Sequence, residues 1–64
     1  MVDTELVNKC VKLIHEFDMT SESQLMEHIN PRETTSVLER LDYLGLITIT
    51  DDYADGLHFI VNKD

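Results

Sequence analysis

The chain has 64 residues, with 13 Asp or Glu against 5 Lys or Arg, and its formal net charge is −8 at pH 7. A chain of this length forms one domain, residues 1–64, and buries only about 60% of the surface that the unfolded chain exposes. We therefore expect marginal stability, which a partner or a second copy would increase. The acid excess repels phosphate and argues against autonomous DNA binding. No apolar run approaches the roughly 18 residues of a membrane-spanning helix, so no membrane partner is expected.

Cysteine content and the first residues bear on location. Cys10 is the only cysteine, so the chain cannot form an internal disulfide. The first ten residues, MVDTELVNKC, are acidic, whereas a secretory signal begins with basic residues. Both features favour a reducing, cytoplasmic location. Cys10 falls on the apolar side of a predicted helix and is expected to be an inert core thiol.

The sequence contains no arrangement typical of a metal site or an active site. His15, His28 and His58 lie on three different predicted elements, and no two of them have the short spacing that presents two ligands to one ion. There is no Gly-rich phosphate loop, and the carboxylates are scattered over solvent-facing positions. We predict a protein that is not an enzyme, with no catalytic residues, no metal and no cofactor.

The first predicted element is an amphipathic helix that begins at residue 3 or 4 and ends near residue 17. Its polar side carries Asn8, Lys12 and His15. Residues 18–20 interrupt the pattern and end the helix. Its apolar side, at helical spacing, consists of Leu6, Val7, Cys10, Val11, Leu13, Ile14 and Phe17.

A second, short helix is predicted from Ser21 to about Ile29. Ser21 and Gln24 have the spacing of a capping box, in which the Gln side chain binds the backbone N–H of the capping residue. Leu25, Met26 and Ile29 are expected to face inward. The next helix follows at once, so the turn between the two helices is very tight.

The central element is a helix from Asn30 to about Leu44. Asn30 is a favourable N-cap, Pro31 stands where its missing N–H costs nothing, and Glu33 can reach back to the cap amide. Gly45 can adopt the left-handed conformation that ends a helix, after which the next residue packs against the last turn. At about 100° per residue, the apolar side holds Thr34, Val37, Leu38, Leu41 and Leu44. The opposite side holds Arg32, Ser36, Glu39 and Tyr43.

The end of the chain predicts an antiparallel hairpin of Ile47–Asp51 against Leu57–Val61, with Asp55-Gly56 as the turn signal. The apolar residues of both strands share one face only if the residue numbers of each pair of opposite residues add up to an even number. An odd loop of about three or five residues ending at Gly56 would provide that register. Ile60 then points away from the helices and is exposed, together with Thr48, Thr50 and His58.

Three helices followed by a two-stranded hairpin wing is the order of a small winged helix. The segment Val37–Ile47, VLERLDYLGLI, resembles the end of the recognition helix and the first wing strand of winged helix-turn-helix transcription regulators. The resemblance implies an α+β fold over Glu5–Val61 and a role in transcription control. It also implies that Asp51–Gly56 is the wing tip. The groove-facing side of the recognition helix would consist of Pro31, Arg32, Thr35, Ser36 and Glu39.

Two functions are open on this basis. In one, a repressor-like dimer inserts the central helix into the DNA major groove, with contacts from Arg32, Thr35, Ser36, Glu39 and Arg40. In the other, the acidic module binds a protein partner with a basic surface, such as a DNA-binding protein or a polymerase. Charge favours the second, because the predicted turn holds three acids where wings that bind phosphate carry Lys or Arg. The expected partner surface is Arg32, Glu39, Tyr43, Asp51, Asp52, Tyr53 and Asp55.

The apolar pattern as a whole predicts one continuous core. Its expected members are Leu6, Cys10, Leu13, Ile14, Phe17, Leu25, Ile29, Val37, Leu38, Leu41, Leu44, Ile47, Ile49 and Phe59.

Overall fold

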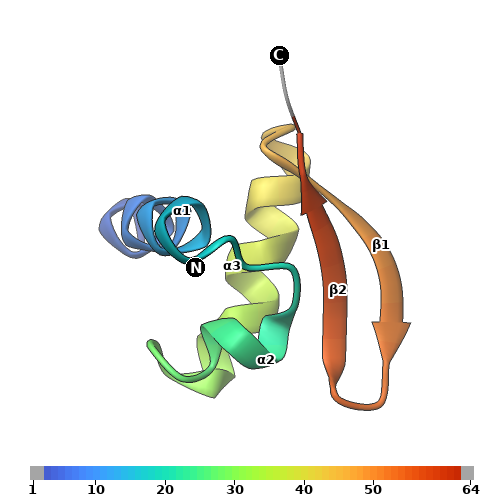
Figure 1. Cartoon of the computed structure of the whole chain (residues 1–64). Helices are drawn as coiled ribbons and strands as arrows, with labels where there is room; N and C mark the ends of the chain where they lie inside the picture. Colours follow the sequence, from blue (N-terminus) through green and yellow to red (C-terminus); the bar gives the residue numbers. More distant parts are fainter. Residues whose placement is uncertain (1–2, 63–64) are drawn as a thin grey trace.

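The computed structural model describes residues 3–62, which form three helices followed by an antiparallel hairpin (Figure 1). This α+β arrangement has the layout expected of a small winged helix. The elements are α1 (Thr4–Phe17), α2 (Glu22–Leu25), α3 (Pro31–Tyr43), β1 (Ile47–Tyr53) and β2 (Gly56–Val61). In Figure 1, α3 lies in the middle, with α1 on one side and the hairpin on the other. None of the helices in the described part of the chain is long and apolar enough to cross a membrane.

Helix α1 begins and ends at aspartates. Asp3 is the N-cap, and its carboxylate accepts a hydrogen bond from the Glu5 N–H at 3.0 Å. Asp18 is the C-cap in the left-handed region, with φ of 50°. This residue redirects the chain, and the side chain of the next residue, Met19, is buried in the core. Burial of Met19 was not expected, because the sequence pattern ends at residue 17.

Helix α2 is shorter than the sequence predicts. The helix ends at Leu25, and residues 26–28 continue as a turn. The capping prediction is confirmed in its essential bond, since Gln24 Oε1 accepts from the Ser21 N–H at 3.1 Å. The same oxygen accepts from the Thr20 N–H at 2.7 Å. These side-chain bonds support the start of a single helical turn, which is too short to be stable alone and also depends on the buried Leu25.

Helix α3 begins as expected at Asn30 but without the predicted contribution of Glu33. The Asn30 side chain accepts a hydrogen bond from the Arg32 N–H at 3.0 Å. Within the described residues, the Glu33 carboxylate makes no hydrogen bond to the cap amide, so that expectation was wrong. The Asn30 side chain and the proline that follows it are sufficient to start the helix.

The end of α3 turns directly into β1. Gly45 has φ of 79°, and its N–H donates to the Asp42 carbonyl at 3.0 Å. The Leu46 N–H donates back to the Leu41 carbonyl at 3.0 Å, which completes a Schellman motif. The left-handed residue is therefore required at position 45, and the predicted C-terminal glycine is confirmed.

The hairpin obtains its register through a β-bulge in β1, which the sequence pattern does not predict. Ile49 lies opposite Phe59, with the expected even sum of residue numbers, but Asp52 lies opposite Leu57, and the pairing shifts by one residue between them. Thr50 is the extra residue of a β-bulge, and the turn is the two-residue Ala54-Asp55. The predicted odd loop was therefore wrong. A bulge inserts one residue into one strand, so a tight turn and a single apolar face are both satisfied.

The strands are also longer than predicted at their turn ends. β1 continues to Tyr53, and β2 begins at Gly56. The predicted outward direction of Ile60 is confirmed, since 54% of this residue is exposed.

The core lies between α1, α3 and the inner face of the hairpin. Most of the expected residues are buried or packed against the buried cluster. Phe17 and Leu44 were wrongly assigned to it, because each lies at or beyond the end of a helix, where the turn carries it to the surface. Phe17 stacks on the His28 ring, with centroids 5.2 Å apart. The buried core consists of Val7, Cys10, Ile14, Met19, Leu25, Val37, Leu38, Leu41, Ile47 and Phe59.

We predict that Leu41→Ala lowers the free energy of unfolding by about 2–5 kcal/mol, because it removes a fully buried side chain at the centre of α3. Urea denaturation of both proteins measures this difference. Leu44→Ala is the matched control at the end of the same helix, and since Leu44 is 49% exposed, it should cost about 1 kcal/mol or less. If Leu41→Ala unfolded at the same urea concentration as the parent, α3 would not be the centre of the core.

Candidate functional site

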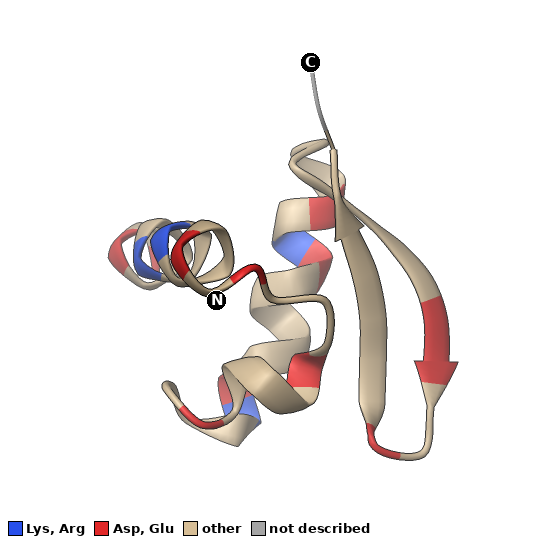
Figure 2. Cartoon of the chain, in the orientation of Figure 1, with Lys and Arg blue, Asp and Glu red and all other residues tan. Residues whose placement is uncertain are grey.

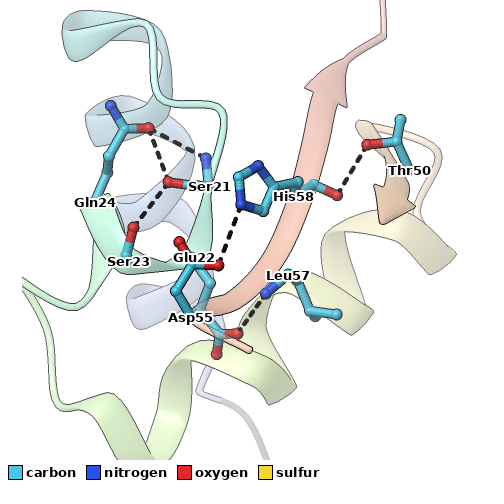
Figure 3. A network of polar contacts seen from close by, with 8 residues as sticks. All are labelled: Ser21, Glu22, Ser23, Gln24, Thr50, Asp55, Leu57 and His58. Carbon is cyan, nitrogen blue, oxygen red and sulfur yellow. Dashed lines mark hydrogen bonds and ion pairs between the residues drawn. The ribbon is translucent and has the colours of Figure 1, made fainter. Parts of the chain in front are cut away.

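A buried carboxylate joins α2, α3 and β2. Glu22, the first residue of α2, is only 3% exposed. Its Oε2 atom accepts hydrogen bonds from the hydroxyl groups of Thr34 and Thr35, both at 2.6 Å. Its Oε1 atom accepts from the Leu57 N–H at 3.0 Å (Figure 3). One side chain therefore ties the first turns of α3 to the start of β2.

The electrostatics of Glu22 follow from these bonds. Burial raises the pKa of the carboxyl, whereas the hydrogen bonds from Thr34, Thr35 and the Leu57 amide lower it. The combined effect of the hydrogen bonds is larger, so the pKa lies below its ordinary value. The group is therefore charged at neutral pH. Its charge is stabilised by three donors rather than by a cation, which makes each of these hydrogen bonds charge-assisted.

Gly56 allows the hairpin to approach this carboxylate. A Cβ atom at position 56 would lie 3.0 Å from Glu22 Oε1 and 3.1 Å from its Cβ, and Gly56 has φ of 123°. The backbone conformation therefore favours glycine strongly, and the close approach of Glu22 leaves little room for a Cβ atom. Sequence reasoning missed Glu22 because a glutamate in the first turn of a helix is ordinarily a solvent-exposed partner of the helix dipole. The adjacent threonines on α3 were the only signal.

The hairpin carries three exposed aspartates and an exposed tyrosine near its turn, which we call the acidic hairpin segment: Asp51, Asp52, Tyr53 and Asp55. All four are exposed, and no Lys or Arg occurs between residues 47 and 61 (Figure 2). His58 Nε2 lies 3.4 Å from Asp55 Oδ1. The His58 and Tyr53 rings pack edge to face, with their centroids 4.6 Å apart. The structure therefore brings four of the predicted partner-binding residues together.

The other predicted residues line the exposed side of α3. Pro31, Arg32, Ser36 and Glu39 are all exposed. Thr35 is exposed in part, but its hydroxyl donates to Glu22. Of the residues expected to contact DNA, Thr35 therefore already has an intramolecular partner.

Tyr43 does not lie beside the acidic hairpin segment, which corrects the expectation of one continuous surface. Tyr43 is the last residue of α3, and β1 starts just beyond it. The turn is six residues farther along β1, about 20 Å from the strand start. Figure 1 shows the turn and the C-terminal end of α3 at opposite ends of the hairpin. Tyr43 is 80% exposed and contacts Arg40, whose guanidinium lies 5.5 Å from the ring centroid.

Arg32, by contrast, lies at the same end of the molecule as the hairpin turn. It is three residues before Thr35, and Thr35 and Leu57 bind the same Glu22 carboxylate. The predicted surface therefore divides into two. One part is Arg32 with the acidic hairpin segment, and the other is Tyr43 with Arg40 and Glu39 toward the far end of α3.

A separate groove of about 380 Å³ lies where the end of α1 meets the end of β2. The exposed Ile60 borders it, so the apolar residue predicted from strand register forms part of a concave surface. The groove is lined by Ile14, His15, Asp18, Met19, Thr20, Ile60, Val61 and Asn62.

Within residues 3–62 no three His, Cys, Asp or Glu side chains are grouped as metal ligands. Cys10 is buried, and burial raises the pKa of its thiol. A comparison with models of protein families, with curated proteins and with solved structures finds no match for this chain.

We predict that Glu22→Gln lowers the free energy of unfolding by about 1–3 kcal/mol at pH 7, because a neutral amide replaces a buried charge with three donors. The folded-state pKa lies below the ordinary value of 4.5, so charged Glu22 stabilises the fold above that pH. The contribution is lost as the pH falls through the folded-state pKa.

Urea denaturation at several pH values tests this prediction. The difference between the parent and Glu22→Gln should be complete at pH 7 and should shrink as the pH falls below 4.5. Glu27→Gln, at an exposed position after α2, is the matched control and should show little effect at any pH. A pH-independent difference would mean that the Glu22 charge does not link the three elements.

Proposed function

We propose that this chain is a cytoplasmic winged-helix module of transcription control that acts by binding a protein partner with a basic surface. The single observation that carries the proposal is the acidic hairpin segment. Three exposed aspartates lie around one turn, in a hairpin whose residues 47–61 include no Lys or Arg. Such a surface attracts a basic partner over a long range and increases the rate of association.

The arrangement of polar groups on α3 also favours a protein partner over DNA. A helix in the major groove needs free donors for phosphates and base edges. On the exposed side of α3, Arg32 is available, but the Thr35 hydroxyl binds Glu22, and Glu33 and Glu39 add negative charge. DNA binding as a repressor-like dimer is the second candidate. The exposed Ser36, between Arg32 and Arg40 on α3, is the observation in its favour.

We predict that the isolated protein binds duplex DNA weakly or not at all at about 0.15 M salt, because its charge of −8 opposes contact with phosphates. A band-shift titration against mixed duplexes, repeated at low salt, measures this. Counterion release makes any real phosphate contact strongest at low salt. A sub-micromolar, sequence-selective complex at the higher salt would overturn the proposal and favour the repressor-like function.

We predict that Asp51→Asn, Asp52→Asn and Asp55→Asn combined slow association with the partner by about tenfold and flatten its salt dependence. The partner is obtained by affinity capture from the source organism, and association rates are measured by biolayer interferometry.

The matched control neutralises three exposed acids elsewhere, Glu5, Glu16 and Glu27, each changed to Gln. This control changes the net charge equally but leaves the acidic hairpin segment intact. Equal slowing by the two triple variants would mean that only net charge matters, and the acidic hairpin segment would not be the binding surface.

A further inference from the structure

The outer edge of β1 presents backbone groups that have no partner strand in the described chain. The sheet has the order β1-β2, and β1 lies at its free edge (Figure 1). In an antiparallel pair, two residues directly opposite each other either exchange both backbone hydrogen bonds or both point their backbone groups outward. Some residues of β2 form backbone hydrogen bonds on the side away from β1. The β1 residues opposite them must direct their own backbone groups to the free edge.

Two positions of β1 can be assigned in this way. The Phe59 N–H donates to the Thr20 carbonyl at 2.9 Å, on the side of β2 away from β1. Ile49, which lies opposite Phe59, therefore directs its backbone groups to the free edge. The Leu57 N–H donates to Glu22 on that same side of β2, so Asp52, opposite Leu57, does so as well.

The bulge makes this assignment consistent. Outward-facing backbone groups ordinarily recur every second residue along a strand, but Ile49 and Asp52 are three apart. The extra residue, Thr50, accounts for the difference, since its hydroxyl donates to the His58 carbonyl at 3.2 Å and it has no partner in the register. The free edge therefore continues past the bulge into the acidic hairpin segment.

Charge determines what can pair with this edge. Asp51 lies opposite His58 and Asp52 opposite Leu57, so the two carboxylates project from opposite faces of the sheet. A second copy of the chain would bring another charge of −8 to the same edge. A strand with two adjacent basic residues would instead place one cation on each face, opposite one carboxylate each.

We propose that the outer edge of β1 binds an extended, basic segment of a partner protein as an added strand. This proposal rests on the proposed function and specifies how the partner binds. Backbone hydrogen bonds to Ile49 and Asp52 hold the segment, and the two carboxylates select for an adjacent pair of Lys or Arg residues. The exposed Tyr53 follows Asp52 directly and supplies an aromatic surface at the end of the added strand.

The probe is a synthetic eight-residue peptide with a central Lys-Arg pair and three residues of alternating Thr and Val on each side. Two controls have the same length, one with Glu-Glu at the centre and one that keeps Lys-Arg but carries N-methyl groups on all of its backbone amides. This N-methylation removes the donors on both edges of the peptide and leaves its charge unchanged. Binding is followed by fluorescence anisotropy, and the Ile49 and Asp52 amides are followed by NMR and hydrogen exchange.

Two variants of one position separate the backbone from the charge. Asp52→Asn removes the carboxylate but keeps the outward N–H, and Asp52→Pro removes both. Proline is tolerated where a strand N–H faces solvent, and thermal denaturation checks that both variants fold. We expect Asp52→Asn to weaken peptide binding by about threefold and Asp52→Pro by about thirtyfold.

Support for the proposal requires that the Lys-Arg peptide binds and protects the two amides, while both control peptides fail. Equal binding of the N-methylated peptide, or equal affinities of the two variants, would overturn strand addition but leave recognition of a basic partner intact. Concentration-dependent self-association that protects the same amides without peptide would assign the edge to a second copy instead. No binding of any basic peptide would overturn strand addition, whereas the two triple variants test the proposed function independently.

Discussion

The buried carboxylate of Glu22 is the interaction on which the relative positions of α2, α3 and the hairpin depend. Removing a charge from water is costly, and it is tolerated here because two hydroxyl groups and one backbone amide bind the carboxylate. These donors come from separate elements, so the charge is satisfied only when the elements meet correctly. Misplacing the hairpin would leave a buried charge with fewer donors, and this penalty makes one arrangement strongly preferred.

Two other features of the hairpin, a glycine and a β-bulge, accompany its close packing against Glu22. Gly56 is needed because its φ of 123° strains any L side chain, and a Cβ atom there would lie only 3.0 Å from Glu22 Oε1. The bulge at Thr50 lets a two-residue turn coexist with a single apolar face, because it places Ile49 opposite Phe59 while Asp52 lies opposite Leu57, whose amide binds Glu22. Local backbone irregularity in β1 thus reconciles the tight turn with the apolar face that packs on the core.

The Glu22 hydrogen bonds and the edge position of β1 also determine which polar groups are exposed on the surface. Glu22 binds the Thr35 hydroxyl, which leaves α3 with fewer donors for nucleic acid. Asp51 and Asp52 are consecutive in an edge strand, so their carboxylates project from opposite faces of the sheet. Acids on an edge strand also discourage self-pairing, which protects a small protein from aggregation. The basic extended segment that we propose as the partner would meet both the charge and the free backbone groups.

The sequence by itself determined the order of the elements, their approximate ends and most of the core, because these follow from local periodicity and capping chemistry. Asn30, Gly45 and the alternation around Phe59 act within a few residues of themselves, and each behaves as predicted. The acids of the hairpin could also be predicted as a group, since they are neighbours in the chain.

Only the tertiary structure decided what depends on elements distant in the chain. Glu22 was missed because its three donors lie 12, 13 and 35 residues away. Tyr43 was wrongly placed beside the hairpin turn because helix periodicity gives the side of a residue but not its distance from another element. The bulge was missed because pattern alone does not distinguish an odd loop from a tight turn plus one extra residue, and packing against α2 and α3 selects between them.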